Sequence, residues 1–247
     1  MLRGYSITLI IILGVLTIPD WFFNNKSVSN AEYLTITEVT KPQEPQKESI
    51  NSIQKKVFIP PAVTIAAPFF PQAPDNKWIL PRAEACSEAN LVLAAYYIKG
   101  EELNKSQFKK EIIDLTKIQE KAFWTYIEIP IHDLKSLYDT YYPNIGKSRI
   151  IENPTIDDIK KELSKWHLII IPTAWRKLEN PHFFGEWPRF HTVLVRWYDD
   201  TYFYTNEVGM MKGENFKYPQ DVIMNAMHDL VEGDITQWAK RILVIGK

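Results

Sequence analysis

Between residues 83 and 166 the chain carries apolar residues at a helical period. Leu91, Val92 and Ala95 share one apolar stripe, and Gly100 follows it as a stop signal, which predicts a helix over 83–99. The same periodicity predicts three further helices, over 106–121, 131–141 and, after the N-cap candidate Thr155, about 155–166.

The last third changes to the patterns of strands. Residues 168–171 form an unbroken apolar run typical of a buried strand, and residues 191–198 alternate and are rich in Val, Leu and Trp. The pair Asp199-Asp200 indicates a turn before a returning strand over 202–205. A helix over 220–230 and a strand over 241–245 complete the chain. Helices followed by strands predict an α+β fold, with a helical side packed on an antiparallel sheet.

The N-terminal segment differs from this pattern. Arg3 precedes an uncharged apolar run over 4–19, which is the layout of a secretory signal or an uncleaved membrane anchor; a buried core helix is the remaining interpretation. Residues 26–56 alternate proline with charged and amide side chains and cannot bury a core, so we expect a polar tether. We therefore expect residues 1–25 to target or anchor a folded domain over 57–247 outside the cytoplasm, either attached to the membrane or secreted.

Composition narrows the classes of function. Of the 247 residues 45% are hydrophobic and 24% are charged, as in ordinary globular proteins. Lys and Arg number 29 against 30 Asp and Glu, so no basic surplus favours nucleic-acid binding. A single cysteine excludes an internal disulfide and a zinc site built on several thiolates. No metal or organic cofactor is implied.

The single cysteine, Cys86, lies in the first turn of the first predicted helix or close to it. Unpaired backbone N–H groups and the helix dipole favour a thiolate at that position, which is the form that acts as a nucleophile. The alternative is a small buried hydrophobe. An unpaired thiol in an exported protein favours the catalytic interpretation.

A nucleophilic thiol needs a base, and five histidines are available. His191 opens the longest predicted strand, where it can be held rigidly; His182, in the preceding loop, is a weaker candidate. The returning strand ends at Asn206 and Glu207, and either side chain could orient the His191 ring, although Asn-Glu before a glycine also suits a simple turn.

Gln72 lies fourteen residues before the cysteine in a proline-rich segment. Its side-chain amide and the backbone N–H of Cys86 could together donate hydrogen bonds to an oxyanion. Taken alone, such a glutamine is more often a surface residue.

The order Gln, Cys on a helix, His on a strand and Asn or a carboxylate after the next turn resembles the papain-like arrangement. More narrowly, Pro-Phe-Phe-Pro-Gln-Ala-Pro and Pro-Arg-Ala-Glu-Ala-Cys-Ser-Glu-Ala-Asn resemble the start of domains related to cysteine peptidase family 39, whose best-known members are the double-glycine leader peptidases of bacteriocin exporters. The stretches His-Thr-Val-Leu-Val-Arg-Trp-Tyr-Asp-Asp and Tyr-Thr-Asn-Glu-Val-Gly resemble that family's histidine hairpin and following turn. The resemblance covers about 190 residues and is closest to a stand-alone, exported, bacterial branch.

The resemblance implies a papain-like cysteine peptidase fold with Gln72 at the oxyanion hole, Cys86 as nucleophile and His191 as base. Papain-like sites place the orienting residue sixteen positions after the histidine, which is Glu207 here. Strand alternation agrees, because Glu207 shares a side with Thr205, and Asn206 stays the alternative.

Three positions depart from the family pattern: Ser87 replaces a glycine after the cysteine, Trp197-Tyr198 replaces Gly-Tyr, and Glu207-Val208 replaces Asp-Pro. None removes a catalytic group. The chain lacks the exporter modules, so a double-glycine leader is not implied as substrate.

We therefore predict an exported thiol hydrolase that cleaves an amide bond in a peptide or protein. Two alternatives stay open: an acyltransferase or transglutaminase-like enzyme with the same catalytic groups, and a catalytically retired domain that binds peptide or cell-wall polymer through aromatic side chains.

Overall fold

The computed structural model describes residues 58–183, 189–231 and 239–247. The targeting or anchoring segment over 1–25 and the tether over 26–56 lie outside the described residues. Among the described residues, every helix is too short or too polar to cross a bilayer.

The helices begin and end close to where their periodicity predicts. The four apolar stripes correspond to α1 (Cys86–Lys99), α2 (Lys105–Phe123), α3 (Ile131–Tyr141) and α4 (Ile156–Ser164), and a shorter α5 (Gln220–Ala226) follows later in the chain. The N-cap expected at Thr155 is confirmed: its side chain accepts the backbone N–H of Asp158, and Asp158 bonds back to the N–H of Thr155.

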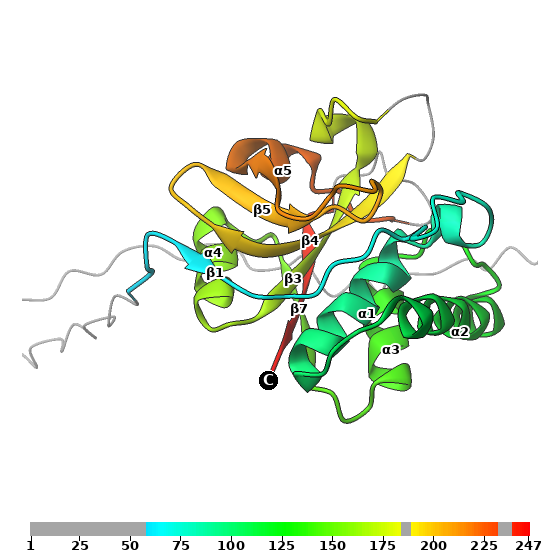
Figure 1. Ribbon diagram of the computed structural model, residues 1–247. Helices are drawn as coiled ribbons and strands as arrows, with labels where there is room; N and C mark the ends of the chain where they lie inside the picture. Colours follow the sequence, from blue (N-terminus) through cyan, green and yellow to red (C-terminus); the bar gives the residue numbers. More distant parts are fainter. Residues whose placement is uncertain (1–57, 184–188, 232–238) are drawn as a thin grey trace, which may run out of the picture. The chain divides into compact units, whose positions relative to one another are not determined.

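Antiparallel strands form one sheet in the order β2-β7-β3-β4-β5-β6, with β1 paired to β4. The strands are β1 (Val63–Thr64), β2 (Lys147–Glu152), β3 (Leu168–Ala174), β4 (Phe190–Tyr198), β5 (Tyr202–Asn206), β6 (Phe216–Pro219) and β7 (Arg241–Gly246). Figure 1 shows α1, α2 and α3 grouped together beside the sheet, with α4 and α5 apart from them. The predicted α+β fold, with helices packed on an antiparallel sheet, is confirmed.

The strands β1, β2 and β6 were not predicted. β1 is two residues long, and β2 and β6 lie at the two ends of the main strand path, where each pairs with a single neighbour. Edge strands bury less apolar surface than central strands, so their sequences carry a weak pattern.

Two helix ends differ from the prediction. The first α-helix begins at Cys86 rather than at residue 83, because a 3-10 turn over Arg82–Glu84 precedes it. The helix predicted over 220–230 ends at Ala226, and the next residues bond to the end of β3, where the His228 N–H donates to the Pro172 carbonyl.

The core lies between α1 and the central strands. Leu91, Val92 and Leu93 of α1 and the run 168–171 of β3 are inaccessible to solvent. Such burial on every side makes α1 a central helix, and its buried first turn includes two polar side chains, Ser87 and Glu88.

Glu88 is buried without a hydrogen-bond partner for either carboxyl oxygen among the described residues. Burial raises the pKa of this carboxyl well above its ordinary value, and the charge of Cys86 raises it further. The folded protein therefore holds Glu88 in its protonated form at pH values where an unfolded chain ionises it.

We expect Glu88→Gln to stabilise the protein increasingly as pH rises. Below about pH 4, the ordinary range of a glutamate in the unfolded chain, both states hold the proton and the substitution changes little. Above that pH, the unfolded wild-type chain has an ionised Glu88, which must take up a proton on folding. The free energy of unfolding of the wild type therefore falls as the pH rises toward the raised pKa, whereas the glutamine variant needs no proton. Urea unfolding at pH 4 and pH 8 measures the difference, with exposed Glu102→Gln as control. An equal effect at both pH values would contradict the prediction.

Candidate active site

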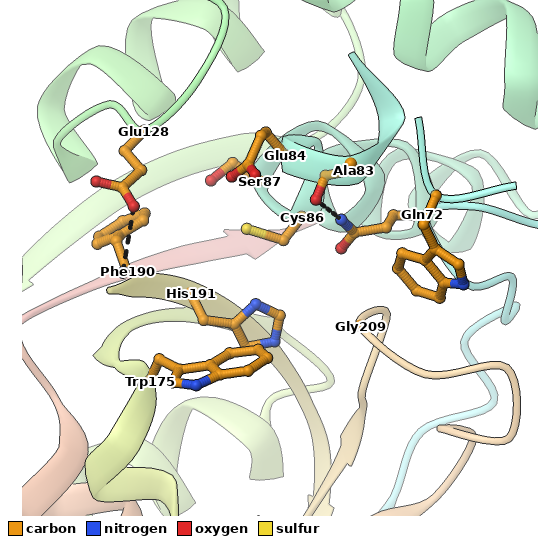
Figure 2. Close-up of a pocket in the computed structure, with 11 residues that line it drawn as sticks. Gln72, Ala83, Glu84, Cys86, Ser87, Glu128, Trp175, Phe190, His191 and Gly209 are labelled. Atoms are coloured by element: carbon orange, nitrogen blue, oxygen red, sulfur yellow. Dashed lines mark hydrogen bonds between the residues drawn. The ribbon is translucent and has the colours of Figure 1, made fainter. Parts of the chain in front are cut away.

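Cys86 is the first residue of α1. Ala85 precedes it as the N-cap and offers no side-chain bond, so the helix dipole acts on the sulfur without a competing side-chain cap. The side chain is 7% exposed, and Figure 2 shows its sulfur pointing into a pocket. The predicted place of Cys86 in the first helical turn is thus correct.

Two further polar residues of α1 dock this helix on β4. The Asn90 amide donates to the backbone carbonyl of Thr192 (2.9 Å) and contacts its hydroxyl (3.1 Å), and the Ser87 hydroxyl lies 3.4 Å from the same hydroxyl. Because Thr192 adjoins His191 and Asn90 lies one turn after Cys86, these bonds set the thiol beside the imidazole. Ser87, a departure from the family pattern, therefore makes a contact that glycine lacks.

His191 lies between the thiol and a carboxylate. Its Nε2 is 2.6 Å from the Glu207 carboxylate, and Cys86 lines the same pocket as the ring. Since Glu207 occupies Nε2, Nδ1 is the atom left for the sulfur. The His191 and Glu207 side chains are almost inaccessible to solvent, so water does not compete for the hydrogen bond between them.

The Glu207 carboxylate is held by more than the imidazole. One oxygen accepts the Gly209 N–H (3.0 Å), and the other accepts the Tyr218 hydroxyl (2.8 Å), which itself accepts a bond from the Asn180 amide (2.7 Å). The turn is tight, because a side chain at Gly213 would place its Cβ 1.8 Å from the Glu207 carbonyl oxygen. This network fixes the carboxylate on the ring.

Asn206 points elsewhere. Its amide donates to the Pro68 carbonyl (2.7 Å), and its oxygen accepts a 3.4 Å bond from Arg196. Successive strand residues face opposite sides, so only one of Asn206 and Glu207 can reach His191, and in the structure it is Glu207. Asn206 instead ties β5 to the segment around Pro68.

The two titrating groups change each other's charge state. Burial by itself would raise the pKa of the Cys86 thiol, but the His191 ring and Thr192 bring it below the ordinary value. Burial likewise disfavours the charged imidazole, yet the Glu207 carboxylate and Cys86 together raise the pKa of His191 to about 10. Each group therefore shifts the other toward its charged form, thiolate for Cys86 and imidazolium for His191.

An aromatic pair covers one side of the imidazole. The Trp175 and Phe183 rings stack 3.8 Å apart, and both meet His191 edge-on, with centroids 5.8 and 5.5 Å away. Figure 2 shows Trp175 against the His191 ring. Such a cover restrains the ring and keeps water from its hydrogen bonds.

Gln72 lies at the same pocket. Its backbone N–H donates to the Val208 carbonyl, which ties its segment to the turn after Glu207. Its side-chain nitrogen donates to the carbonyls of Arg82 (3.0 Å) and Ala83 (2.8 Å), whereas its Oε1 is buried without a partner among the described residues. The donor expected for an oxyanion is thus bonded to the chain just before Cys86.

The pocket has a volume of about 120 Å³. Besides Gln72, Cys86 and His191, its lining includes the carboxylates of Glu84 and Glu128. No group of three or more His, Cys, Asp or Glu side chains in the described parts of the chain is arranged to hold a metal ion.

His182, the weaker candidate base, packs edge-on against Phe216 at 6.1 Å. The sequence did not predict five residues at or around the pocket, which are Trp175, Phe183, Asn180, Glu84 and Glu128. Trp175 directly follows β3 and Phe183 lies in a loop, so neither follows a periodic pattern that could have marked it.

The comparisons with known proteins concern the fold. A solved structure described as a putative C39-like peptidase from Bacillus anthracis matches with a TM-score of 0.51 and 15% sequence identity, over 75% of this chain and 98% of that one. The chain has the fold of a C39-like peptidase. No family model matches the sequence, and no curated protein matches it.

We expect iodoacetamide to alkylate Cys86 with a pH midpoint below that of a free thiol, which is near 8.5. His191→Ala removes the ring that lowers the pKa of the thiol and leaves the burial that raises it, so the midpoint should move upward. Alkylation rates from pH 5 to 10, read by mass spectrometry with free cysteine as reference, give both midpoints. The same midpoint in both proteins would show that His191 does not act on the sulfur.

Proposed function

We propose that the protein is a cysteine peptidase that cleaves an amide bond in a peptide or protein. The observation that carries the proposal is the buried group of Cys86, His191 and Glu207, in which a thiol with a lowered pKa shares one pocket with an imidazole held by a carboxylate at 2.6 Å. A nucleophile, a base and an orienting group in this order are what acyl transfer through a thiol requires.

In the proposed reaction the Cys86 thiolate attacks the substrate carbonyl carbon. His191 then gives its Nδ1 proton to the leaving amine, and the carbon–nitrogen bond breaks to leave a thioester. Water attacks the thioester, with His191 taking its proton, and the acid product leaves. Glu207 stays bonded to Nε2 throughout and stabilises the imidazolium.

The oxyanion donors in this proposal are the backbone N–H of Cys86 and the Gln72 amide. Gln72 serves only if one of its hydrogens leaves the carbonyl of Arg82 or Ala83 when substrate binds. A bound carbonyl that carries developing charge is a stronger acceptor than a neutral peptide carbonyl, which favours that exchange.

We also propose that the enzyme acts outside the cytoplasm. This part rests on the sequence alone, on Arg3 and the apolar run after it. The N-terminal segment, if retained, would hold the domain at a membrane.

Product analysis tests the proposal. We expect a peptide library incubated with the protein to yield pairs of fragments whose masses sum to the substrate plus one water, and Cys86→Ala to yield none. Adding a primary amine separates hydrolysis from acyl transfer, because a transferase would convert the acyl fragment chiefly to the amide. A protein that cleaves nothing, and whose thiol is alkylated no faster than free cysteine, would be a retired binding domain, and the proposal would fail.

We expect Glu207→Ala to reduce turnover by roughly ten- to a thousand-fold, more than Asn206→Ala, with Glu207→Gln between them. Without the carboxylate, burial lowers the pKa of His191, so the alkaline limb of the pH–rate profile should move to lower pH. Asn206→Ala is the matched control, because it removes bonds to Pro68 and Arg196 but leaves the ring contact. A larger loss for Asn206→Ala, in variants shown to be folded, would assign the orienting role to Asn206.

A further inference from the structure

Two carboxylates that the proposed reaction does not use line the pocket beside the thiol. Glu84 ends the 3-10 turn before Cys86, and Glu128 lies just before α3. Glu128 accepts the backbone N–H of Phe190 at 3.2 Å, next to His191, whereas Glu84 has no side-chain hydrogen bond or ion pair among the described residues. Neither Lys nor Arg is among the described residues that line this pocket.

Burial disfavours the charged form of both carboxylates. Burial raises the pKa of Glu84. Burial also raises the pKa of Glu128, and the charge of Glu84 adds to that effect, while the Phe190 N–H and the Arg189 charge oppose it. Two partly dehydrated negative groups that repel each other would be relieved by a cation placed between them.

The pocket also contains a hydrogen-bond acceptor, the Gln72 amide oxygen, that has no donor among the described residues. Gln72 is 4% exposed, and its buried Oε1 has no hydrogen-bond partner among the described residues. Figure 2 shows this oxygen turned away from Ala83 and toward the space beside Cys86 and His191, with Glu128 on the other side of the sulfur. A buried amide oxygen without a partner is unfavourable until an N–H group reaches it.

We propose that this pocket selects substrates with a cationic side chain, lysine or arginine, next to the scissile amide. Glu84 and Glu128 bind the charged end, and Gln72 Oε1 accepts an N–H of the substrate. The substrate class rests on the proposed peptidase function, but the preference of the pocket for positive charge does not.

The size of the pocket agrees with one side chain rather than a whole ligand. Its volume of about 120 Å³ is well below the roughly 300–1,000 Å³ of pockets that enclose complete small molecules. A peptide would therefore lie over the opening and insert one residue. Trp175, which stacks on Phe183, forms an apolar wall of the pocket. The methylene groups of the inserted substrate side chain would pack against this wall.

The charge preference can be measured on the thiol itself. Cys86 is the single cysteine, so methanethiosulfonate reagents modify one position: the thiolate displaces methanesulfinate and forms a mixed disulfide. The measured quantity is the rate with the 2-aminoethyl reagent divided by the rate with the 2-sulfonatoethyl reagent, each rate taken relative to that of free cysteine. We expect this ratio to be lower in the double variant Glu84→Gln/Glu128→Gln than in the wild type, on the order of 10-fold or more. Glu102→Gln, which removes an exposed carboxylate outside the pocket, should keep the wild-type ratio.

Matched peptides test the substrate class. Arginine peptides should be cleaved on the order of 10- to 100-fold more efficiently, in kcat/KM, than the same peptides with neutral citrulline, and lysine peptides than those with norleucine. The comparison of the two pairs shows whether guanidinium or ammonium fits better. In the double glutamine variant both ratios should approach one.

The outcomes separate the two proposals. Cleavage with no preference for positive charge, together with a reagent ratio that the double variant leaves unchanged, would overturn the inference while the peptidase function stood. A reagent ratio that depends on the two carboxylates, with no peptide cleaved, would retain the cation-selecting pocket and overturn the peptidase function.

Discussion

The buried carboxylate of Glu207 sets the positions of the groups around it. A charge without solvent access is stable only when its oxygens are satisfied, and here an imidazole, a backbone N–H and the Tyr218 hydroxyl satisfy them. The glycine-containing turn that follows β5 and the β6 strand that carries Tyr218 are both required for this arrangement. The carboxylate thereby links the local fold of the second half to the charge state of His191.

The site is assembled where the helical half meets the sheet. Cys86 comes from the first turn of α1, and His191 from the start of β4, 105 residues later in the chain. The bonds from Asn90 to Thr192 join these two elements one residue away from the imidazole. Thiol and base are therefore held by rigid secondary structure rather than by loops, which suits a reaction that needs a fixed distance between them.

The polarity of the pocket differs on its two sides. The imidazole side is covered by aromatic rings and excludes water, which strengthens the Cys86, His191 and Glu207 contacts. Two carboxylates and a buried amide oxygen without a partner among the described residues complete the polar part of the lining. Both sides favour positive charge, on the ring in one case and, in our proposal, on the substrate in the other.

Local sequence determined the parts of the protein that depend on neighbours in the chain. Apolar periodicity placed α1 through α4, the capping pattern placed the start of α4, and strand alternation turned Glu207 and Asn206 to opposite sides. Only the tertiary structure decided the edge strands, the aromatic cover of His191, the bonds that hold the Gln72 amide, and the placement of Glu84 and Glu128 in one pocket with the thiol. The physical reason is that helix and turn signals act within a few residues, whereas these contacts join segments farther apart than one turn, and those segments carry no periodic pattern of their own.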